Sequence, residues 1–341
     1  MITSYLLPAD SLVLVTGANG FIASHTIDQL LAKGFRVRGT VRAPKPWLNA
    51  FFDERYGKGR FETLVMTNLG DAQELDKAMK GVSGVIHMAS DLTFSSDPNA
   101  VIPWVKDSVL KVLEAASRTE TIQRVVLTSS SRAAFTSLPG TTKGLTVEDN
   151  TFNDDSVKAA WDPDTPADIK PFAVYSASKT ESEKAAWEWM KDNKPHFDFN
   201  TVLPDFNTGK VLHPEIGGST MGYVRKLLKG DSSPFETFPP QWYVDVEDTA
   251  RLHVIALLSH EVKSERLFAF AESKNWTDHV EALSKLRPDN KLIPKPPVNE
   301  ARDEANVVPA KRAESLLQSF YGRPGWTPFH ESLAAGIEGL E

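Results

Sequence analysis

One short segment near the start of the chain constrains its fold more than any other: residues 12–23 read LVLVTGANGFIA. The apolar run predicts a strand, which breaks at Gly17 and Gly20 and continues into the helix-like stretch SHTIDQLLAKG. Gly17 permits a tight turn, Gly20 lets the backbone approach a ligand, and Ala23 lets the helix pack against the strand. The order strand, glycine turn, helix N-terminus predicts an anion site suited to a dinucleotide pyrophosphate. The spacing is GxxGxxA rather than GxGxxG, and a chance turn is the alternative.

The next strand-like segment indicates which dinucleotide would fit. Residues 36–42 read RVRGTVR and contain no Asp or Glu. Sites that prefer NAD usually carry an acid about 20 residues past the glycines, where it accepts a hydrogen bond from the ribose 2′-OH. Arg42, with Lys45 just after it, offers positive groups to a 2′-phosphate instead. The sequence therefore favours NADPH, and a solvated basic strand end is the alternative.

The order of apolar segments predicts the fold class. Short apolar strands, such as 84–90 and 124–131, alternate with helix-like stretches, such as 101–118 and 173–193. This alternation is typical of βαβ units and predicts an α/β Rossmann fold, a doubly wound parallel sheet. After Pro204, Gly and Pro become frequent, which predicts a smaller C-terminal substrate lobe. We expect a cofactor-binding domain of residues 1–204 plus 243–271, and a substrate-binding lobe of residues 205–242 plus 272–341.

Composition and charge exclude several kinds of chemistry and partner. The 341-residue chain has no cysteine, which excludes disulfides, zinc–thiolate sites and thiol nucleophiles. A formal net charge of −7 without a sustained basic block argues against nucleic acid or an anionic membrane. No apolar run approaches the ~18 residues of a membrane span, and MITSYLLPAD lacks the regions of a signal peptide. His25 and His87 lack a third ligand at metal spacing. We expect a cytoplasmic protein without a metal.

The first candidate chemistry lies in YSASK, residues 175–179. On a helix, positions i and i+4 share one face, so Tyr175 and Lys179 project into the same space. A neighbouring cation favours the phenolate and lowers the tyrosine pKa from its usual value of ~10. Tyr175 then becomes a usable proton donor to a carbonyl oxygen. The pattern YxxxK is common by chance, and an exposed Tyr beside a solvated Lys is the alternative.

A row of hydroxyl side chains, LTSSS at 127–131, follows a predicted strand. Open α/β sheets bind ligands at the carboxyl ends of their strands. One hydroxyl among Ser129, Ser130 and Ser131 can therefore hydrogen-bond a substrate oxygen and stabilise the charge that develops on it. We expect the other two to cap or turn the chain.

Taken in order, the motifs resemble the extended short-chain dehydrogenases/reductases, in particular dihydroflavonol reductase-like enzymes and yeast and fungal NADPH-dependent aldehyde or carbonyl reductases. They are spread over nearly the whole chain: VTGANGFIASH, KGFRVRGTVR, HMAS, RVVLTSSS, VYSASKTESE, NTVLP, PPQWYV and GRPGW. The resemblance implies a stereoselective carbonyl reductase that reduces ketones or aldehydes to alcohols with NADPH. It also implies that Ser130, Tyr175 and Lys179 are catalytic, with Tyr175 as the proton donor.

The resemblance assigns cofactor contacts as well, and it has one departure. The asparagine that many family members use in a proton relay falls on Val105 in this chain. Lys179 is expected to bind the cofactor ribose as well as to lower the pKa of Tyr175. The implied cofactor-binding residues are Gly17, Asn19, Gly20, Phe21, Ile22, Arg42, Lys45, Asn68, Leu69, Ala89, Lys179 and Pro204.

The substrate pocket and the precise function leave alternatives open. Pocket candidates lie in segments expected after strand ends, where they can instead pack between lobes. A nucleotide-sugar epimerase or dehydratase of the same fold is one alternative function, and Arg42 without a nearby acid argues against it. A non-catalytic NADP(H)-sensing protein is the other, and the Tyr–Lys pair argues against it. The pocket candidates are Phe94, Phe206, Tyr223, Gln241 and Trp242.

Overall fold

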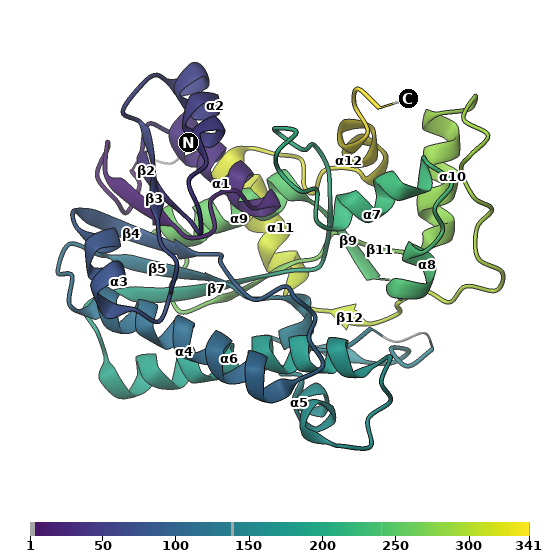
Figure 1. The fold of residues 1–341 in the computed structure, drawn as a ribbon, viewed down its shortest axis with the longest axis horizontal. Helices are drawn as coiled ribbons and strands as arrows, with labels where there is room; N and C mark the ends of the chain where they lie inside the picture. The colour runs from purple at the N-terminus through teal and green to yellow at the C-terminus, as the bar shows by residue number, and fades with distance from the viewer. Residues whose placement is uncertain (1–3, 138–139, 240, 341) are drawn as a thin grey trace.

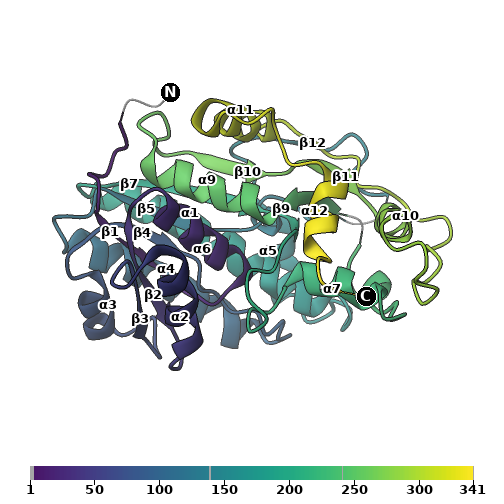
Figure 2. The same ribbon diagram turned by 90° about the horizontal axis from the view of Figure 1, so that it is seen from above.

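The large sheet has the expected Rossmann topology. The computed structural model describes residues 4–137, 140–239 and 241–340. Within these residues, seven parallel strands form one sheet in the order β10-β7-β5-β4-β1-β2-β3 (Figures 1 and 2). The predicted α/β doubly wound sheet is therefore confirmed. The strand bounds are β1 Leu12–Val15, β2 Arg36–Val41, β3 Phe61–Val65, β4 Val82–His87, β5 Arg124–Thr128, β7 Asp198–Pro204 and β10 Arg266–Ala269.

Helices cover both faces of this sheet, as Figures 1 and 2 show. One face packs against α1 (Phe21–Ala32), α2 (Pro46–Tyr56), α9 (Val246–Leu258) and α11 (Ala310–Tyr321). The other packs against α3 (Ala72–Met79), α4 (Pro98–Ser117) and α6 (Lys170–Asn193). In β1, Val13 and Val15 join the first apolar cluster and Leu14 joins the second. Burial on both faces explains why the strands read as continuous apolar runs.

A smaller lobe follows the carboxyl ends of the large sheet's strands (Figure 1). It contains the sheet β11-β9-β8 and has its own apolar cluster, which includes Phe206, Trp276 and Leu333. The expected smaller C-terminal lobe is therefore present. Its strands are β8 Phe206–Thr208, β9 Gln241–Asp245 and β11 Glu272–Lys274, and its helices are α7 Thr220–Leu227, α8 Pro234–Thr237, α10 Trp276–Leu286 and α12 Phe329–Gly336.

The chain crosses between the two parts more often than the expected boundaries imply. It returns to the large sheet as α9 and β10, in line with the range 243–271. Helix α11 returns later, because Leu316 and Leu317 belong to the apolar cluster on the large sheet. This helix lies in the range 272–341, which we expected in the smaller lobe, so the domain boundaries stay a prediction. The remaining elements are the short 3-10 helix η1 Ser131–Ala133, α5 Asp154–Trp161, and the paired strands β6 Thr146–Val147 and β12 Asn306–Val307.

Among the described residues, no helix is both long and apolar enough to cross a bilayer.

Candidate active site

The glycine turn between β1 and α1 is tightly packed. Gly17 has a φ of +71°, a left-handed conformation that side chains disfavour. A Cβ at Gly17 would lie 3.3 Å from the Cα of Ala89, and one at Gly20 would lie 3.2 Å from the Gly17 carbonyl oxygen. Gly20 is the N-cap of α1 and provides no side-chain cap, so the first amides of the helix can face a phosphate. The turn therefore fits a dinucleotide pyrophosphate.

Thr16 joins this turn to the loop after β4. Its Oγ1 accepts hydrogen bonds from the backbone N–H groups of Met88 (2.9 Å) and Ala89 (3.0 Å) and lies 2.9 Å from Nδ1 of His87. Burial lowers the pKa of His87 to about 3, so its imidazole is neutral. Thr16 was not among the predicted site residues, although its place directly before the glycine turn in the sequence could have indicated this role.

Two cations, Arg42 and Lys45, follow the end of β2 and have no ion-pair partner among the residues that the structure describes. Arg38 already has partners: its Nε lies 2.7 Å from Oε1 of Glu62, and it also donates to two backbone carbonyls at the C-terminal end of α3. Arg42 is exposed and Lys45 is half-buried. Neither forms an ion pair with any residue that the structure describes. Arg42 and Lys45 are therefore the cations available to a 2′-phosphate.

The other expected cofactor contacts lie along the same edge of the sheet. Asn68 follows β3, and its Oδ1 accepts a hydrogen bond from the backbone N–H of Gly70 (2.9 Å). Leu69 is half-buried against the apolar cluster beneath it. Pro204 ends β7 and lines a large cavity. Their contacts with a cofactor stay predictions, as do those of Asn19 in the turn, Phe21 and Ile22 at the start of α1, and Ala89 after β4.

Ser130, Tyr175 and Lys179 come together at the carboxyl end of β5. Ser130 caps η1, and its Oγ accepts a hydrogen bond from the backbone N–H of Arg132 (3.2 Å). Tyr175 and Lys179 lie one turn apart on α6, which packs against η1. Ser130 and Tyr175 both line a cavity of about 560 Å³. Lys179 is buried, and its Nζ donates to the carbonyl oxygen of Thr128 (3.3 Å).

Burial dominates the proton affinities of this group. It raises the pKa of Tyr175, while a hydrogen bond with Ser130 and the positive charge of Arg132 act in the opposite direction. Burial lowers the pKa of Lys179 to about 8, against the attraction of Glu183. We expected Lys179 to lower the pKa of Tyr175. In the structure, the cation that acts on the phenol is instead Arg132, since the Lys179 ammonium is directed to the Thr128 carbonyl.

Glu183 anchors the base of the site from the next turn of α6. Its carboxylate accepts hydrogen bonds from the hydroxyls of Ser129 (2.7 Å) and Thr201 (2.8 Å), and it pairs with Arg266 at 2.8 Å. Burial alone would raise the pKa of Glu183, but Arg266 and these hydroxyls hold it below its ordinary value. The charged carboxylate therefore fixes α6 against β5, β7 and β10, which positions Lys179 beside Thr128.

Val105 occupies an apolar contact between two helices. It is 2% exposed and packs in a cluster with Ala173, Val174 and Ala177 of α6. The departure from the family's asparagine therefore places a methyl-bearing side chain where many relatives have an amide.

The large cavity beside Tyr175 contains three of the five expected pocket residues. Phe94, Tyr223 and Gln241 line it, and the ring centroid of Phe94 lies 5.0 Å from that of Tyr175. Trp242 does not line it and packs edge-on against Phe270, with ring centroids 6.0 Å apart. Its role in binding substrate, like those of the other candidates, stays a prediction.

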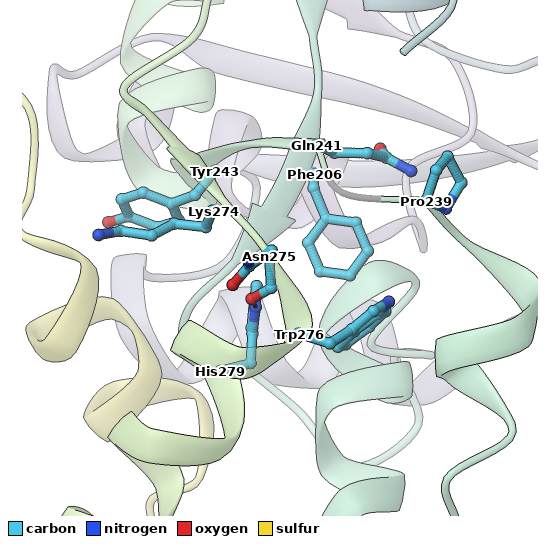
Figure 3. Close-up of a pocket in the computed structure, with 8 residues that line it drawn as sticks. All are labelled: Phe206, Pro239, Gln241, Tyr243, Lys274, Asn275, Trp276 and His279. Atoms are coloured by element: carbon cyan, nitrogen blue, oxygen red, sulfur yellow. Dashed lines mark hydrogen bonds between the residues drawn. The ribbon is translucent and has the colours of Figure 1, made fainter. Parts of the chain in front are cut away.

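Phe206, the fifth candidate, lines a separate pocket in the smaller lobe (Figure 3). This pocket has a volume of about 10 Å³, which is no more than the space of one water molecule. Figure 3 shows Phe206 of β8 beside Trp276 and His279 of α10. Gln241 lines both pockets, whereas Pro240 of the PPQWYV motif lies outside the described residues.

Two charged residues of the large cavity were not singled out in the sequence. Arg132 comes two residues after Ser130, and Asp205 follows Pro204 directly. Burial raises the pKa of Asp205 to about 7, against the opposing charge of Arg132. The signal that could have found both is their position just beyond the ends of β5 and β7, at the edge where open sheets bind ligands.

Comparison with known proteins agrees with this arrangement. The model of the NAD dependent epimerase/dehydratase family matches residues 13–268. Ketoreductase adrE of Penicillium rubens is 49% identical over 98% of each chain, and aldehyde reductase 2 of Sporidiobolus salmonicolor is 38% identical over 97% of this chain and 96% of its own. The crystal structure of Candida albicans Gre2 in complex with NADPH covers 96% of this chain and 98% of its own, with 25% identity and a TM-score of 0.78. The chain therefore belongs to the NAD dependent epimerase/dehydratase family, within the extended short-chain dehydrogenases/reductases.

Proposed function

We propose that this protein reduces ketones or aldehydes to alcohols with NADPH and that it does so stereoselectively. The observation that carries the proposal is the placement of Ser130 and Tyr175 on the wall of a cavity of about 560 Å³, with Lys179 one helical turn away. Similarity to ketoreductases and an aldehyde reductase over nearly the whole chain supports carbonyl reduction as the reaction class.

The residues at the carboxyl edge of the sheet fit a nicotinamide dinucleotide. Gly17 and Gly20 leave room for the pyrophosphate at the start of α1. Arg42 and Lys45 would bind the 2′-phosphate, which supports NADPH over NADH. When bound, NADPH supplies the hydride that reduces the carbonyl carbon.

The proton comes from the chain itself. The hydroxyl of Tyr175 donates its proton to the carbonyl oxygen of the substrate, and Ser130 donates a hydrogen bond to the same oxygen as negative charge develops on it. The raised pKa of Tyr175 keeps the phenol protonated before the reaction. The positive charge of Arg132 then favours the phenolate that remains. Lys179 would hold the cofactor ribose.

The test measures consumption of NADPH or NADH with a panel of aromatic ketones, β-keto esters, aldehydes and dihydroflavonols. We expect turnover with at least one of these classes and a preference for NADPH. Chiral chromatography of the alcohol then tests stereoselectivity. No turnover across the panel, together with conversion of a nucleotide sugar, would assign the chain to the epimerase or dehydratase alternative instead.

A further inference from the structure

Arg132 is a buried cation on the wall of the large cavity. Its side chain is buried, with the residue 8% exposed, and its guanidinium carbon lies 6.0 Å from the ring centroid of Phe172. Its backbone is held at both ends: the N–H donates to Ser130 Oγ (3.2 Å), and the carbonyl accepts from Nδ2 of Asn153 (2.8 Å). The residue is therefore fixed beside the catalytic serine, with its side chain at the cavity.

Other buried arginines of the chain have protein partners. Arg124, 0% exposed, donates to the carbonyl oxygens of Ala256 and Ser259 and pairs with a carboxylate of β7. Arg266 pairs with Glu183 and donates to two backbone carbonyls. The guanidinium of Arg132 has no hydrogen bond and no ion pair within 4.0 Å to residues 4–137, 140–239 or 241–340.

This lack of a partner matters because a guanidinium carries five N–H donors. Taking a charge out of bulk water costs free energy, and hydrogen bonds to a bound anion offset that cost. Since Arg132 lines a cavity large enough for a small molecule, an anion bound there would occupy its free donors.

The charges around the cavity favour an anionic partner. Among the described lining residues, Arg132 and Lys226 are cations, and Asp205 is the carboxylate. Burial lowers the pKa of Arg132, and the negative charge of Asp205 opposes this more than that of Asp303, which lies outside the lining. Burial raises the pKa of Asp205 to about 7, and its Oδ2 already accepts a hydrogen bond from the Trp242 N–H (3.3 Å). Because Arg132 and Lys226 face one carboxylate, the lining has an excess of positive charge even when Asp205 is ionised.

We propose that Arg132 determines substrate specificity by binding a carboxylate of the substrate, so that the preferred substrates are oxo acids. The ketone oxygen of such a substrate meets Tyr175 and Ser130, while its carboxylate forms a paired hydrogen bond with the guanidinium. The inference rests on the proposed carbonyl reductase activity and names its substrate class.

The experiment compares matched substrates that differ only in charge: benzoylformate and levulinate, each beside its methyl ester. For the wild-type enzyme with NADPH, we expect kcat/KM for at least one acid to exceed that of its ester by about tenfold or more, the size of a charge-assisted hydrogen bond. Arg132→Met should reduce this acid-to-ester ratio to near one, and Arg132→Lys should reduce it less. Lys229→Met removes an equal charge from an exposed lysine that is not among the lining residues, so as the control it should leave the ratio unchanged.

The acid-to-ester ratio of kcat/KM separates binding of the substrate carboxylate from other effects of Arg132. A variant that slows the acid and the ester equally would assign Arg132 to the electrostatics of Tyr175 or to folding and would overturn the inference. The wild-type ratio tests it without any variant, because equal kcat/KM for acid and ester in both pairs also overturns it. Failure of the wild-type enzyme to reduce any of the four compounds or any ketone or aldehyde would reject the proposed function itself. Reduction of the esters without preference for the acids would reject only this inference.

Discussion

The glycine turn and the large cavity lie at the same edge of the sheet but are built in different ways. The turn presents main-chain atoms, and a Cβ added at Gly17 or Gly20 would lie only 3.3 Å or 3.2 Å from the nearest backbone atom. The cavity is lined by side chains from segments that are far apart in the sequence, from Phe94 to Gln241. A turn made of neighbouring residues is encoded locally, whereas a cavity depends on how many segments pack together. Changes in the turn should therefore affect cofactor binding for every substrate, and changes in the cavity should affect one substrate against another.

The largest effect, on kcat, should come from a change at Tyr175. Tyr175→Phe removes the proton donor and keeps the ring, so kcat should fall by roughly 10²-fold or more, the size of general acid catalysis. The affinity for NADPH should change little, since the ring still packs against Phe94. Steady-state kinetics and NADPH fluorescence titration measure the two quantities. Near-normal turnover with an unchanged pH profile would mean that Tyr175 is not the acid.

A single added methyl group in the glycine turn should weaken NADPH binding. Gly17→Ala forces a side chain into a φ of +71° and against Ala89 at 3.3 Å, so NADPH affinity should fall by about tenfold or more. Gly81→Ala is the matched control, because its φ is +75° but no atom lies within 4 Å of the added Cβ. Isothermal titration of NADPH into both variants separates an effect at the glycine turn from the general effect of an alanine with a positive φ. Equal affinities in the two variants would show that the turn tolerates the methyl group.

A smaller effect should follow from reversing the charge at the end of β2. Arg42→Glu replaces a charge-assisted contact worth roughly 1.5 to 3 kcal/mol with repulsion, so NADPH should bind about tenfold more weakly or worse while NADH is less affected. Arg36→Glu is the control of equal charge, since Arg36 pairs with Asp10 at 3.4 Å. The ratio of KM values for the two cofactors gives the result. An unchanged ratio in Arg42→Glu would assign the phosphate to Lys45 or another group.

The smallest effect concerns two neighbouring residues of β9. Gln241→Ala should shift the enantiomeric ratio of a bulky prochiral ketone, where ~1.4 kcal/mol between transition states is a factor of ten. Trp242→Ala should shift it less, because Trp242 packs against Phe270 rather than lining the cavity. Reduction of a small aldehyde should be less sensitive in both variants. Chiral chromatography of the alcohol measures the outcome, and a larger shift from Trp242→Ala would place that ring in the substrate's path.

Gln241 and Trp242 also show how much of the site could be predicted from the sequence. The sheet, the glycine turn and the cluster of Ser130 and Tyr175 follow from local patterns that the sequence contains. The cavity does not, because successive residues of a strand point to opposite faces and the sequence alone does not say which face is which. Gln241 lines the cavity and Trp242 does not.

The same limit explains two other differences. Asp205 lines the cavity, while Phe206 beside it packs into the smaller lobe. Arg132 was overlooked because a basic residue after a strand is usually a solvated charge, and its lack of a partner is visible only once the surrounding segments are in place. Helix α11 carries no signal that assigns it to the large sheet rather than to the adjacent lobe, since only its apolar stripe meets the sheet.

The ion pair of Glu183 and Arg266 has a consequence for how this enzyme can evolve. Removing either partner alone leaves a buried charge, which typically costs about 3–5 kcal/mol, whereas replacing both with apolar residues is often neutral. Positions 183 and 266 should therefore be exchanged together among relatives, with single changes rare. Neither Glu183 nor Arg266 is among the lining residues of the cavity, so we expect substrate range to diversify one substitution at a time while the pair that supports α6 is inherited as a unit.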